Sequence, residues 1–265
     1  MDIEFLIIGN EILIGKTLDS NSNWLAKRIT KLGHRITRIT TIGDELDIIS
    51  STLKEILRRE PDIVITSGGL GPTFDDMTLK GVAMALNREL ELDEHAYHAI
   101  KKAYDAAFER GILKLKGMTP EREKMAYLPQ GGIPLPNTVG TAPGVKITEG
   151  DATIFCLQGV PAEMKSTYRN AVLPLLSKKK GKFIEKGFLF EGIGESQIAP
   201  YVSKLEDKYP QLWIKTHPKI GLSVEVELSV TCFNLENGED LTDKVIEELK
   251  KIIINLNGKI KERDK

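Results

Sequence analysis

The sequence feature that most constrains the fold is an alternation of short apolar runs with segments of helical periodicity near the N-terminus. The runs 3–8, 35–42 and 62–66 are rich in β-branched residues, and apolar residues recur at helical spacing in 21–32 and 46–57. Strands that are separated by one helix and short loops pair in parallel, with helices on both faces of the sheet. We therefore predict an α/β fold: an open, mostly parallel sheet with helices on both faces.

A charged linker divides the chain into two predicted domains, 1–177 and 183–258. The segment 177–182 reads SKKKGK, which is typical of a solvated hinge, because four lysines without aromatic neighbours are a weak nucleic-acid footprint. For the second domain we expect a β-α-β-β-α unit in which strict alternation over 224–230 exposes one sheet face to water. Its expected strands are 187–191, 212–217 and 223–233, and its expected helices are 196–208 and 240–255.

The rest of the first domain is predicted to be mainly helical, with one more buried strand. A segment rich in Gly, Pro, Asn and Thr, 131–144, is expected to be loop. The expected helices are 78–86, 94–110, 120–125 and 161–176, and the strand is 153–157.

Charge and composition narrow the class of protein. Lys plus Arg total 37 and Asp plus Glu total 38, so the chain lacks the basic excess of a dedicated DNA-binding protein. Hydrophobic residues make up 41%, too many for disorder, yet no run approaches the roughly 18 apolar residues of a membrane span. Two distant cysteines exclude a disulfide scaffold, and the acidic N-terminus is atypical of a signal peptide. We expect a soluble, cytoplasmic, globular protein without nucleic-acid or membrane partners.

The strongest chemical signal is the string GGLGPTFDDMT, which occupies residues 68–78 directly after a predicted buried strand. Its glycines let the backbone approach a ligand closely, and the helix that follows presents free N–H groups to an anion. Adjacent carboxylates at Asp75 and Asp76 do not suit an anion site unless a cation lies between them and the ligand. The string therefore indicates a phosphate together with a divalent metal. In the plainer alternatives, the glycines only form a tight turn and one aspartate only caps the helix at Thr78.

Two further carboxylates, Glu11 and Asp44, follow predicted strands. Each alone is more often an ordinary solvated surface residue. Ligands of open α/β sheets bind beyond the carboxyl ends of the strands, however, so both are expected beside the glycine string.

Two more loops contain glycine near predicted strands. In NTVGTAPG, residues 137–144, the Asn and Thr side chains can bind a base, a ribose or a phosphate, and they equally form ordinary turns. In GVPAEM, residues 159–164, glycine again separates a strand from a helix, although Glu163 can simply stabilise the helix N-terminus.

The remaining residues form no familiar catalytic pattern. His95 and His98 lie three apart without a third ligand nearby, which favours exposed histidines over a metal site. Neither a Ser-His-Asp arrangement nor a Walker lysine occurs, and the glycine spacing differs from G-x-G-x-x-G.

Four strings in this order resemble the N-terminal part of the CinA family: GNEIL-x-G-x-x-x-D-x-N, GGLGPT-x-DD-x-T, N-x-x-GTAPG and GVP-x-EM. In the first string the residues that carry the resemblance are identified as Gly9, Glu11, Gly15, Asp19 and Asn23. The resemblance covers about residues 1–255. It implies a fold similar to the molybdopterin-binding domains of MoaB, MogA and gephyrin, followed by a KH-like domain. The sequence departs from the family at Leu157-Gln158-Gly159, where Leu-Pro-Gly is frequent.

The resemblance also implies an activity: metal-dependent hydrolysis of the pyrophosphate bond of ADP-ribose, or of FAD, with release of AMP. Many bacterial members carry a further nicotinamide mononucleotide deamidase domain. Because the sequence ends at Lys265, that activity is not expected here. Relatives with this fold are often oligomers, so a homo-oligomer is left open.

The residue assignments combine the strings with the resemblance. The expected metal is Mg²⁺, and Asp76 is the expected general base. Expected catalytic residues are Asp76, Asp44 and Lys124, and expected metal ligands are Asp76, Asp44, Glu11 and Asp75. Expected substrate-binding residues are Gly68, Gly69, Gly71, Thr73, Asn137, Gly140, Thr141, Gly144 and Gly159.

Two other functions compete with hydrolysis. A pterin- or nucleotide-binding protein without hydrolysis fits the same fold, although a pure phosphate binder would prefer Lys or Arg to the pair Asp75-Asp76. Molybdopterin adenylyltransfer uses similar phosphate chemistry, but those relatives carry Gly-Thr-Gly where this chain has Leu-Gly-Pro-Thr.

Overall fold

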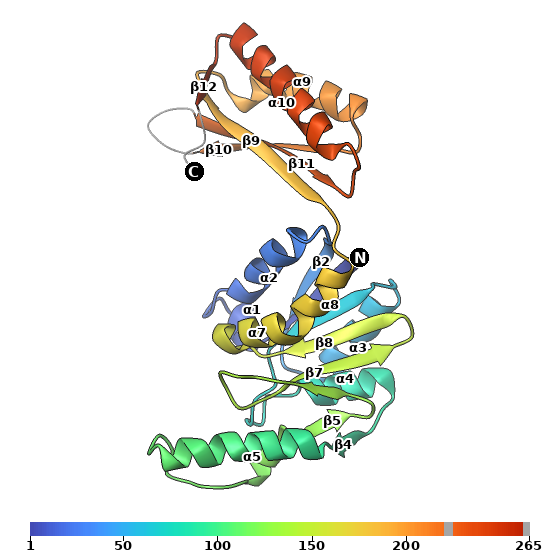
Figure 1. The fold of residues 1–265 in the computed structure, drawn as a ribbon, viewed down its shortest axis with the longest axis vertical. Coiled ribbons are helices and arrows are strands. Elements are labelled where there is room, and N and C mark those ends of the chain that lie inside the picture. The colour runs from blue at the N-terminus through green and yellow to red at the C-terminus, as the bar shows by residue number, and fades with distance from the viewer. Residues whose placement is uncertain (220–224, 262–265) are drawn as a thin grey trace. The chain divides into compact units, whose positions relative to one another are not determined.

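The chain folds into two compact units, seen in the computed structural model, which describes residues 1–219 and 225–261 (Figure 1). The first unit comprises Met1–Thr30 and His34–Lys180. The second comprises Lys31–Gly33 and the chain from Gly181 onward. The boundary at Lys180–Gly181 falls within the predicted linker 177–182, whereas the grouping of Lys31–Gly33 with the second unit is not visible in the sequence.

The first unit is built on a six-stranded sheet with the order β2-β1-β3-β8-β7-β6. Neighbours from β2 to β8 are parallel, whereas β7 pairs antiparallel with both β8 and β6. The predicted open, mostly parallel sheet is therefore confirmed, with an antiparallel edge added. The strands are β1 (Asp2–Ile8), β2 (Arg35–Ile42), β3 (Ile63–Ser67), β6 (Ile133–Leu135), β7 (Gly144–Glu149) and β8 (Ala152–Leu157).

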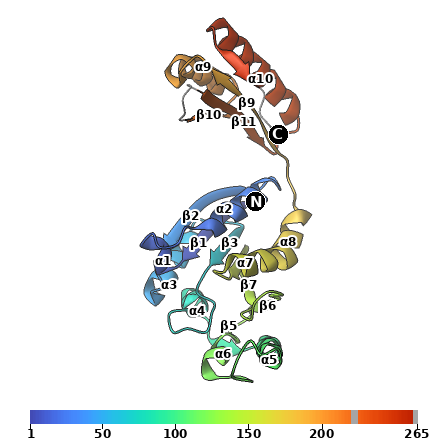
Figure 2. The same ribbon diagram turned by 90° about the vertical axis from the view of Figure 1, so that its left-hand side faces the viewer.

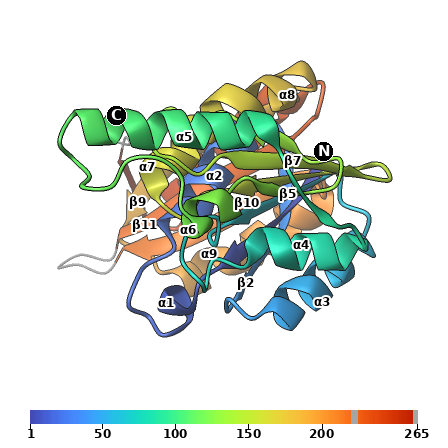
Figure 3. The same ribbon diagram turned by 90° about the horizontal axis from the view of Figure 1, so that it is seen from below.

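Helices cover both faces of this sheet (Figures 2 and 3). Helices α3 and α4 pack together on one face, and α2 contacts α7 on the other. The helices are α1 (Asn10–Leu13), α2 (Ser20–Thr30), α3 (Leu46–Leu57), α4 (Thr78–Leu86), α5 (Glu94–Glu109), α6 (Pro120–Lys124), α7 (Pro161–Thr167) and α8 (Leu173–Lys178), with a π-helical turn at Tyr168–Val172. A separate two-stranded ribbon pairs β4 (Leu90–Leu92) with β5 (Tyr127–Pro129).

The core explains why the central strands read as nearly continuous apolar runs. All of β3 is buried, and every residue of β1 except Asp2 is buried too, because helices cover both faces of the sheet. Residues of α3 and α4, such as Ile49, Leu53 and Val82, pack onto the sheet in the same core.

The segment 131–144, predicted to be loop, contains β6 and leads into β7. The Pro, Gly and Asn residues of this segment indicated a loop. The segment nevertheless forms β6, because β6 is a three-residue strand at the edge of the sheet, where proline is tolerated. Strands β4 and β5 are equally short and were also missed.

The second unit is an antiparallel sheet with the order β10-β11-β9-β12 and two helices. Its elements are β9 (Phe183–Glu191), α9 (Glu195–Lys208), β10 (Trp213–Lys219), β11 (Glu225–Phe233), α10 (Gly238–Asn255) and β12 (Lys259–Lys261). The β-α-β-β-α order is as predicted, with β12 added, and the buried positions Val226, Leu228 and Val230 confirm the alternation. Residues 223 and 224 of the predicted strand lie outside the described residues. Among the described residues, no helix is long and apolar enough to cross a membrane.

Candidate functional site

The loops that follow β1, β2, β3 and β8 meet beyond the carboxyl ends of these strands. Together with the loop before β7 they line a pocket of about 380 Å³, called here the polar pocket. Because parallel strands end at the same edge of a sheet, segments far apart in the sequence meet there. The predicted site residues that line it are Glu11, Asp44, Gly68, Gly69, Gly71, Thr73, Asp75, Asp76, Thr141 and Gly159.

The glycine loop after β3 lies against the backbone of its neighbours. Gly68 has φ +115°, and a Cβ atom there would lie 2.0 Å from the carbonyl oxygen of Ile8. Gly69 has φ +63°, and its Cβ would lie 2.3 Å from Thr78 Oγ1. The Thr78 hydroxyl donates to the Gly68 carbonyl at 2.8 Å, and the Thr78 amide donates to the Gly69 carbonyl at 3.1 Å. Glycine is therefore required by geometry at both positions.

The two aspartates of the loop do not cap the next helix. No side-chain cap bond is made at the start of α4, which excludes the alternative that Asp75 or Asp76 serves only as a cap. Instead both carboxylates turn to Thr73, whose Oγ1 lies 2.5 Å from Asp75 Oδ1 and 2.5 Å from Asp76 Oδ2. The Thr73 amide also donates to Asp76 Oδ2 at 2.9 Å. Since one hydroxyl has one proton, two carboxylates compete for it, and negative charge accumulates at this point.

Asp44 belongs to the same electrostatic cluster. Partial burial raises the pKa of its carboxyl group, and the charges of Glu11, Asp75 and Asp76 raise it further. The Asn10 amide, which donates to Asp44 Oδ2 at 2.8 Å, acts in the opposite direction. Carboxylates that follow β1, β2 and β3 are thus close enough to affect one another, as expected from their placement.

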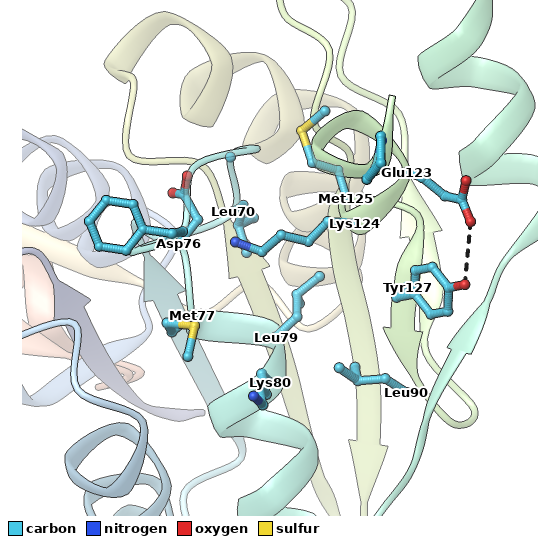
Figure 4. A pocket seen from close by; sticks show the side chains of 14 residues that line it. Leu70, Asp76, Met77, Leu79, Lys80, Leu90, Glu123, Lys124, Met125 and Tyr127 are labelled. Carbon is cyan, nitrogen blue, oxygen red and sulfur yellow. Dashed lines mark hydrogen bonds between the residues drawn. The ribbon is translucent and has the colours of Figure 1, made fainter. Parts of the chain in front are cut away.

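Lys124 approaches this cluster from the end of α6. Its amine donates to the carbonyl oxygen of Thr73, and Figure 4 shows the side chain reaching toward the loop of Leu70 and Asp76. Burial lowers the pKa of the Lys124 amine, whereas the charges of Asp76 and Asp75 raise it. Lys124 lines a neighbouring pocket beside the acidic cluster, so the structure does bring this predicted catalytic residue to the acids.

That neighbouring pocket, called here the apolar pocket, has a volume of about 760 Å³. It lies between the start of α4, the ribbon of β4 and β5, and α6 (Figure 4). Both pockets are lined by Gly69, Leu70, Gly71, Asp76 and Met125, so they adjoin each other along the glycine loop.

Asn137, Gly140 and Gly144, expected to bind the nucleotide, do not line the polar pocket. The Asn137 side-chain amide donates to the Ala142 carbonyl at 2.9 Å and to Glu163 Oε2 at 2.6 Å. Its Oδ1 accepts from the amides of Val139 and Gly140, at 3.1 and 3.0 Å. Asn137 therefore fixes the conformation of its own loop.

The two glycines have packing roles. A Cβ atom on Gly140 would lie 2.1 Å from the Glu163 carboxyl carbon, and one on Gly144 would lie 2.7 Å from Thr167 Cγ2. Both positions therefore let the loop pack closely against α7.

Asn21, which has no predicted role in the site, connects the end of β3 to the loop after β8. Its side chain is buried in α2, and Nδ2 donates to Ser67 Oγ at 2.9 Å and to the Gly159 carbonyl at 2.7 Å. The D-x-N pattern of the first string ends at Asn21. Asn23, to which that asparagine was assigned, is exposed, so this assignment was wrong.

Gln158, the point of departure from the family string, is also structural. Its Nε2 donates to the Ala142 carbonyl at 2.9 Å, and its Oε1 accepts from the Thr167 hydroxyl at 2.9 Å. Its buried amide thus joins the loop before β7 to the loop after β8.

The donor set of the polar pocket consists of carboxylate oxygens, which suit a hard divalent cation. Among the described residues, no group of three His, Cys, Asp or Glu side chains is arranged to hold a metal ion by itself. Mg²⁺ commonly takes one or two carboxylates and completes its coordination with water and substrate phosphate. The pocket fits that second arrangement.

Comparison with known proteins shows the family of this chain. The family model described as a probable molybdopterin binding domain matches residues 4–178. A protein of Sulfurisphaera tokodaii is 42% identical over 262 residues, which cover 97% of each chain. The protein PYRAB15930 of Pyrococcus abyssi is 41% identical over 247 residues, covering 93% of this chain and 95% of that one. Among solved structures, the protein CinA of Thermoplasma acidophilum matches with 37% identity and a TM-score of 0.58, over 68% of this chain and 98% of that one. The predicted resemblance to CinA is confirmed.

Proposed function

The chain belongs to the family of probable molybdopterin-binding domains, and from this premise we propose that its first unit hydrolyses the pyrophosphate bond of a dinucleotide. ADP-ribose and FAD are the proposed substrates, and AMP is the proposed product. The observation that carries the proposal is the polar pocket, in which a glycine loop open to an anion adjoins four carboxylates, Glu11, Asp44, Asp75 and Asp76. An anion site with this much negative charge is consistent with a phosphate that arrives together with a cation.

The diphosphate is proposed to lie on the glycine loop. Gly69 and Gly71 present backbone without side chains, and helix α4 begins at Thr78 behind them. Gly68 lines the pocket as well, but its amide donates to the Leu157 carbonyl at 3.1 Å. Backbone amides and the helix dipole favour negative charge at this position. Thr73 lines the same pocket, where its hydroxyl lies 2.5 Å from one oxygen of Asp75 and of Asp76.

Asp76 and Asp75 are proposed to hold the divalent cation, most simply Mg²⁺, with Glu11 and Asp44 nearby. When bound, the cation neutralises charge on the phosphoryl oxygens and supplies a water of lowered pKa. The Thr73 amide, which donates to Asp76 Oδ2 at 2.9 Å, fixes the Asp76 carboxylate, and this suits a ligand that must keep its position.

The properties of Asp44 favour it over Asp76 as general base, in contrast to the assignment made from the sequence. Burial and neighbouring carboxylates raise the pKa of Asp44, and a carboxylate of raised pKa is the stronger base. In the proposed step, Asp44 takes a proton from water, the water oxygen bonds to phosphorus, and the bridging P–O bond breaks. The Lys124 amine is proposed to stabilise the charge of the leaving phosphate, since it already reaches the glycine loop.

The test incubates the protein with ADP-ribose or FAD, with and without Mg²⁺. Chromatography then measures the AMP that is released. We expect Asp76→Asn and Asp44→Asn each to lower turnover by roughly 10²-fold or more, because each removes a charge that the reaction needs. Removal of divalent ions with EDTA should lower turnover to a similar degree.

The matched control is Asp151→Asn, an exposed carboxylate in the turn between β7 and β8. It should keep the turnover of the unmodified protein, and thermal unfolding should show that all three variants fold. Turnover in Asp76→Asn equal to that of the control would refute the assignment of the site. If the unmodified protein binds these dinucleotides but releases no AMP from them, a binding function replaces the hydrolase.

A further inference from the structure

The apolar pocket has a lining that differs from that of the polar pocket. Its side chains come from the start of α4, from the ribbon of β4 and β5, and from α6. They are mainly aliphatic, thioether and aromatic: Leu70, Phe74, Met77, Leu79, Leu90, Met125 and Tyr127. A concave, mostly apolar pocket with a few polar groups at its rim is typical of a site for an organic ring.

The two pockets are joined where the diphosphate is proposed to lie. Gly69, Gly71 and Asp76 line both, so a molecule whose phosphates rest on the glycine loop has its next groups at the mouth of the apolar pocket. In a dinucleotide, those next groups are a sugar and a planar ring. Continuity with the phosphate site therefore identifies the occupant as part of the same substrate.

The chemistry of the lining suits the face of a planar ring. Met77 and Met125 provide polarisable sulfur atoms, and Tyr127 provides an aromatic ring, all of which contact aromatic rings favourably. Phe74 lines the same pocket with 91% of its surface exposed, so an aromatic side chain is held in water beside the opening. Covering it with a ligand ring would remove apolar area from water.

The rim offers polar groups for the edge of such a ring. Tyr127 and Glu123 lie on one side, with the Tyr127 hydroxyl donating to Glu123 Oε1 at 3.4 Å (Figure 4). Lys80 and Lys124 also line the pocket, and the Lys124 amine lies beside the glycine loop on which the phosphates are proposed to rest (Figure 4). This combination resembles what a nucleoside needs: an apolar face, polar contacts at the edge and cations near its phosphate.

We propose that the apolar pocket is the ring subsite of the enzyme, which binds the planar aromatic ring of the dinucleotide next to the hydrolysed diphosphate. The proposal rests on the proposed function for the position of the phosphates. It assigns Met77, Leu79 and Tyr127 as residues that determine which substrates bind. Adenine and isoalloxazine share the required chemistry, and the two arms of the test distinguish them.

The test measures nucleoside binding without phosphate, metal or turnover. Adenosine and riboflavin are titrated separately into the full chain, with calorimetry for the first and quenching of flavin fluorescence for the second. Met77→Glu places a carboxylate in the apolar pocket and should weaken binding of the true ring by roughly tenfold or more, since the charge must be desolvated. Tyr127→Ala, at a position that is 37% exposed and therefore tolerant of truncation, should weaken it in the same direction.

The matched control is Met84→Glu, the same substitution on helix α4, which begins directly after Met77. Met84 is 44% exposed and lines neither pocket, so its variant should bind like the unmodified protein. The ring that binds to the unmodified protein and is lost selectively in Met77→Glu and Tyr127→Ala is the natural occupant.

Two outcomes separate this proposal from the proposed function. If AMP is released from dinucleotides but Met77→Glu and Tyr127→Ala bind both nucleosides and hydrolyse both dinucleotides like Met84→Glu, the ring subsite is refuted while the hydrolase stands. If no dinucleotide is hydrolysed but a nucleoside still binds and is lost selectively in Met77→Glu, the ring subsite stands and the hydrolase is refuted.

Discussion

The two units of the chain build sheets that end in different ways. In the first unit β2, β1, β3 and β8 run parallel, so their carboxyl ends lie at one edge and the loops that follow them form the polar pocket. In the second unit every neighbouring pair of strands is antiparallel, so the carboxyl ends alternate between opposite edges. The parallel sheet gathers residues from distant parts of the sequence at one place, and the antiparallel sheet distributes them.

Ion pairs occur in both units of the chain. In the first unit Arg59 lies 2.7 Å from Glu4, and in the second Lys186 lies 2.6 Å from Asp243 and Lys261 lies 2.6 Å from Glu225 and 2.8 Å from Glu191. None of the ion pairs found among residues 1–219 and 225–261 includes Glu11, Asp44, Asp75 or Asp76. Burial and the charges of Glu11, Asp75 and Asp76 raise the pKa of Asp44, and a carboxylate of raised pKa in a pocket is typical of a site completed by a ligand.

The largest expected effect is a loss of stability in the second unit alone. Phe190 is fully buried in the core of the second unit, and Phe190→Ala should lower the free energy of unfolding of that unit by about 3–5 kcal/mol. Hydrogen exchange measured by mass spectrometry should show faster exchange in peptides from 183–219 and 225–261. Peptides of the first unit and AMP release should be unaffected.

Phe233→Ala serves as the control for that measurement, because Phe233 is 37% exposed at the end of β11 and should cost about 1 kcal/mol or less. Equal acceleration of exchange in both units after Phe190→Ala would show that they unfold together. The comparison of two independent cores would then be wrong.

The next effect concerns the glycine loop. Gly68→Ala combines a positive φ with a Cβ atom 2.0 Å from the Ile8 carbonyl oxygen, so the loop must shift. We expect a loss of about 2–4 kcal/mol in the free energy of unfolding of the first unit, measured with urea, together with strongly reduced AMP release.

Gly150→Ala isolates the backbone contribution to that loss. Gly150 has φ +55°, but nothing lies within 4 Å of a Cβ atom at that position. Its variant should lose only about 1 kcal/mol and keep its activity. Equal losses of unfolding free energy in the two variants would mean that the close approach of residue 68 to Ile8 does not contribute to the destabilisation.

The smallest expected effect is a pH dependence confined to the first unit. His34 is 1% exposed, and burial lowers its pKa below the ordinary value of 6.5. The unfolded chain therefore binds a proton near pH 6.5, whereas the folded chain binds one only at lower pH. Stability from the neutral ring is complete above pH 6.5 and declines as the pH falls through the window between the two pKa values.

Urea unfolding at pH 7.5 and pH 5.5 should show a His34-dependent loss of about 1 kcal/mol. His34→Gln should abolish that part of the pH dependence, and His98→Gln, an exposed control, should retain it. If His34→Gln leaves the pH dependence of stability unchanged, that dependence arises from other titratable groups.

Much of the fold was predictable because it depends on local patterns. The runs 3–8 and 35–42 are parallel strands and 46–57 is a helix, since periodicity and loop length act over a few residues. The short strands β4, β5 and β6 were not predictable, because three residues carry too little pattern and their pairing partners are distant in sequence.

The residues of the candidate site also differ in how far the sequence predicts their roles. The string at 68–78 by itself determined a turn that needs glycine and a pair of carboxylates, since conformational freedom and charge belong to each residue. The strand pattern already placed Asp44 near Asp75 and Asp76, whereas only the tertiary structure decided that burial and these charges raise its pKa, and that Asn21 reaches the Gly159 carbonyl. It also decided that Asn137 bonds within its own loop instead of facing the pocket. Electrostatic coupling and hydrogen bonds depend on distances in space, and these are set by the pairing and direction of strands that lie far apart in the chain.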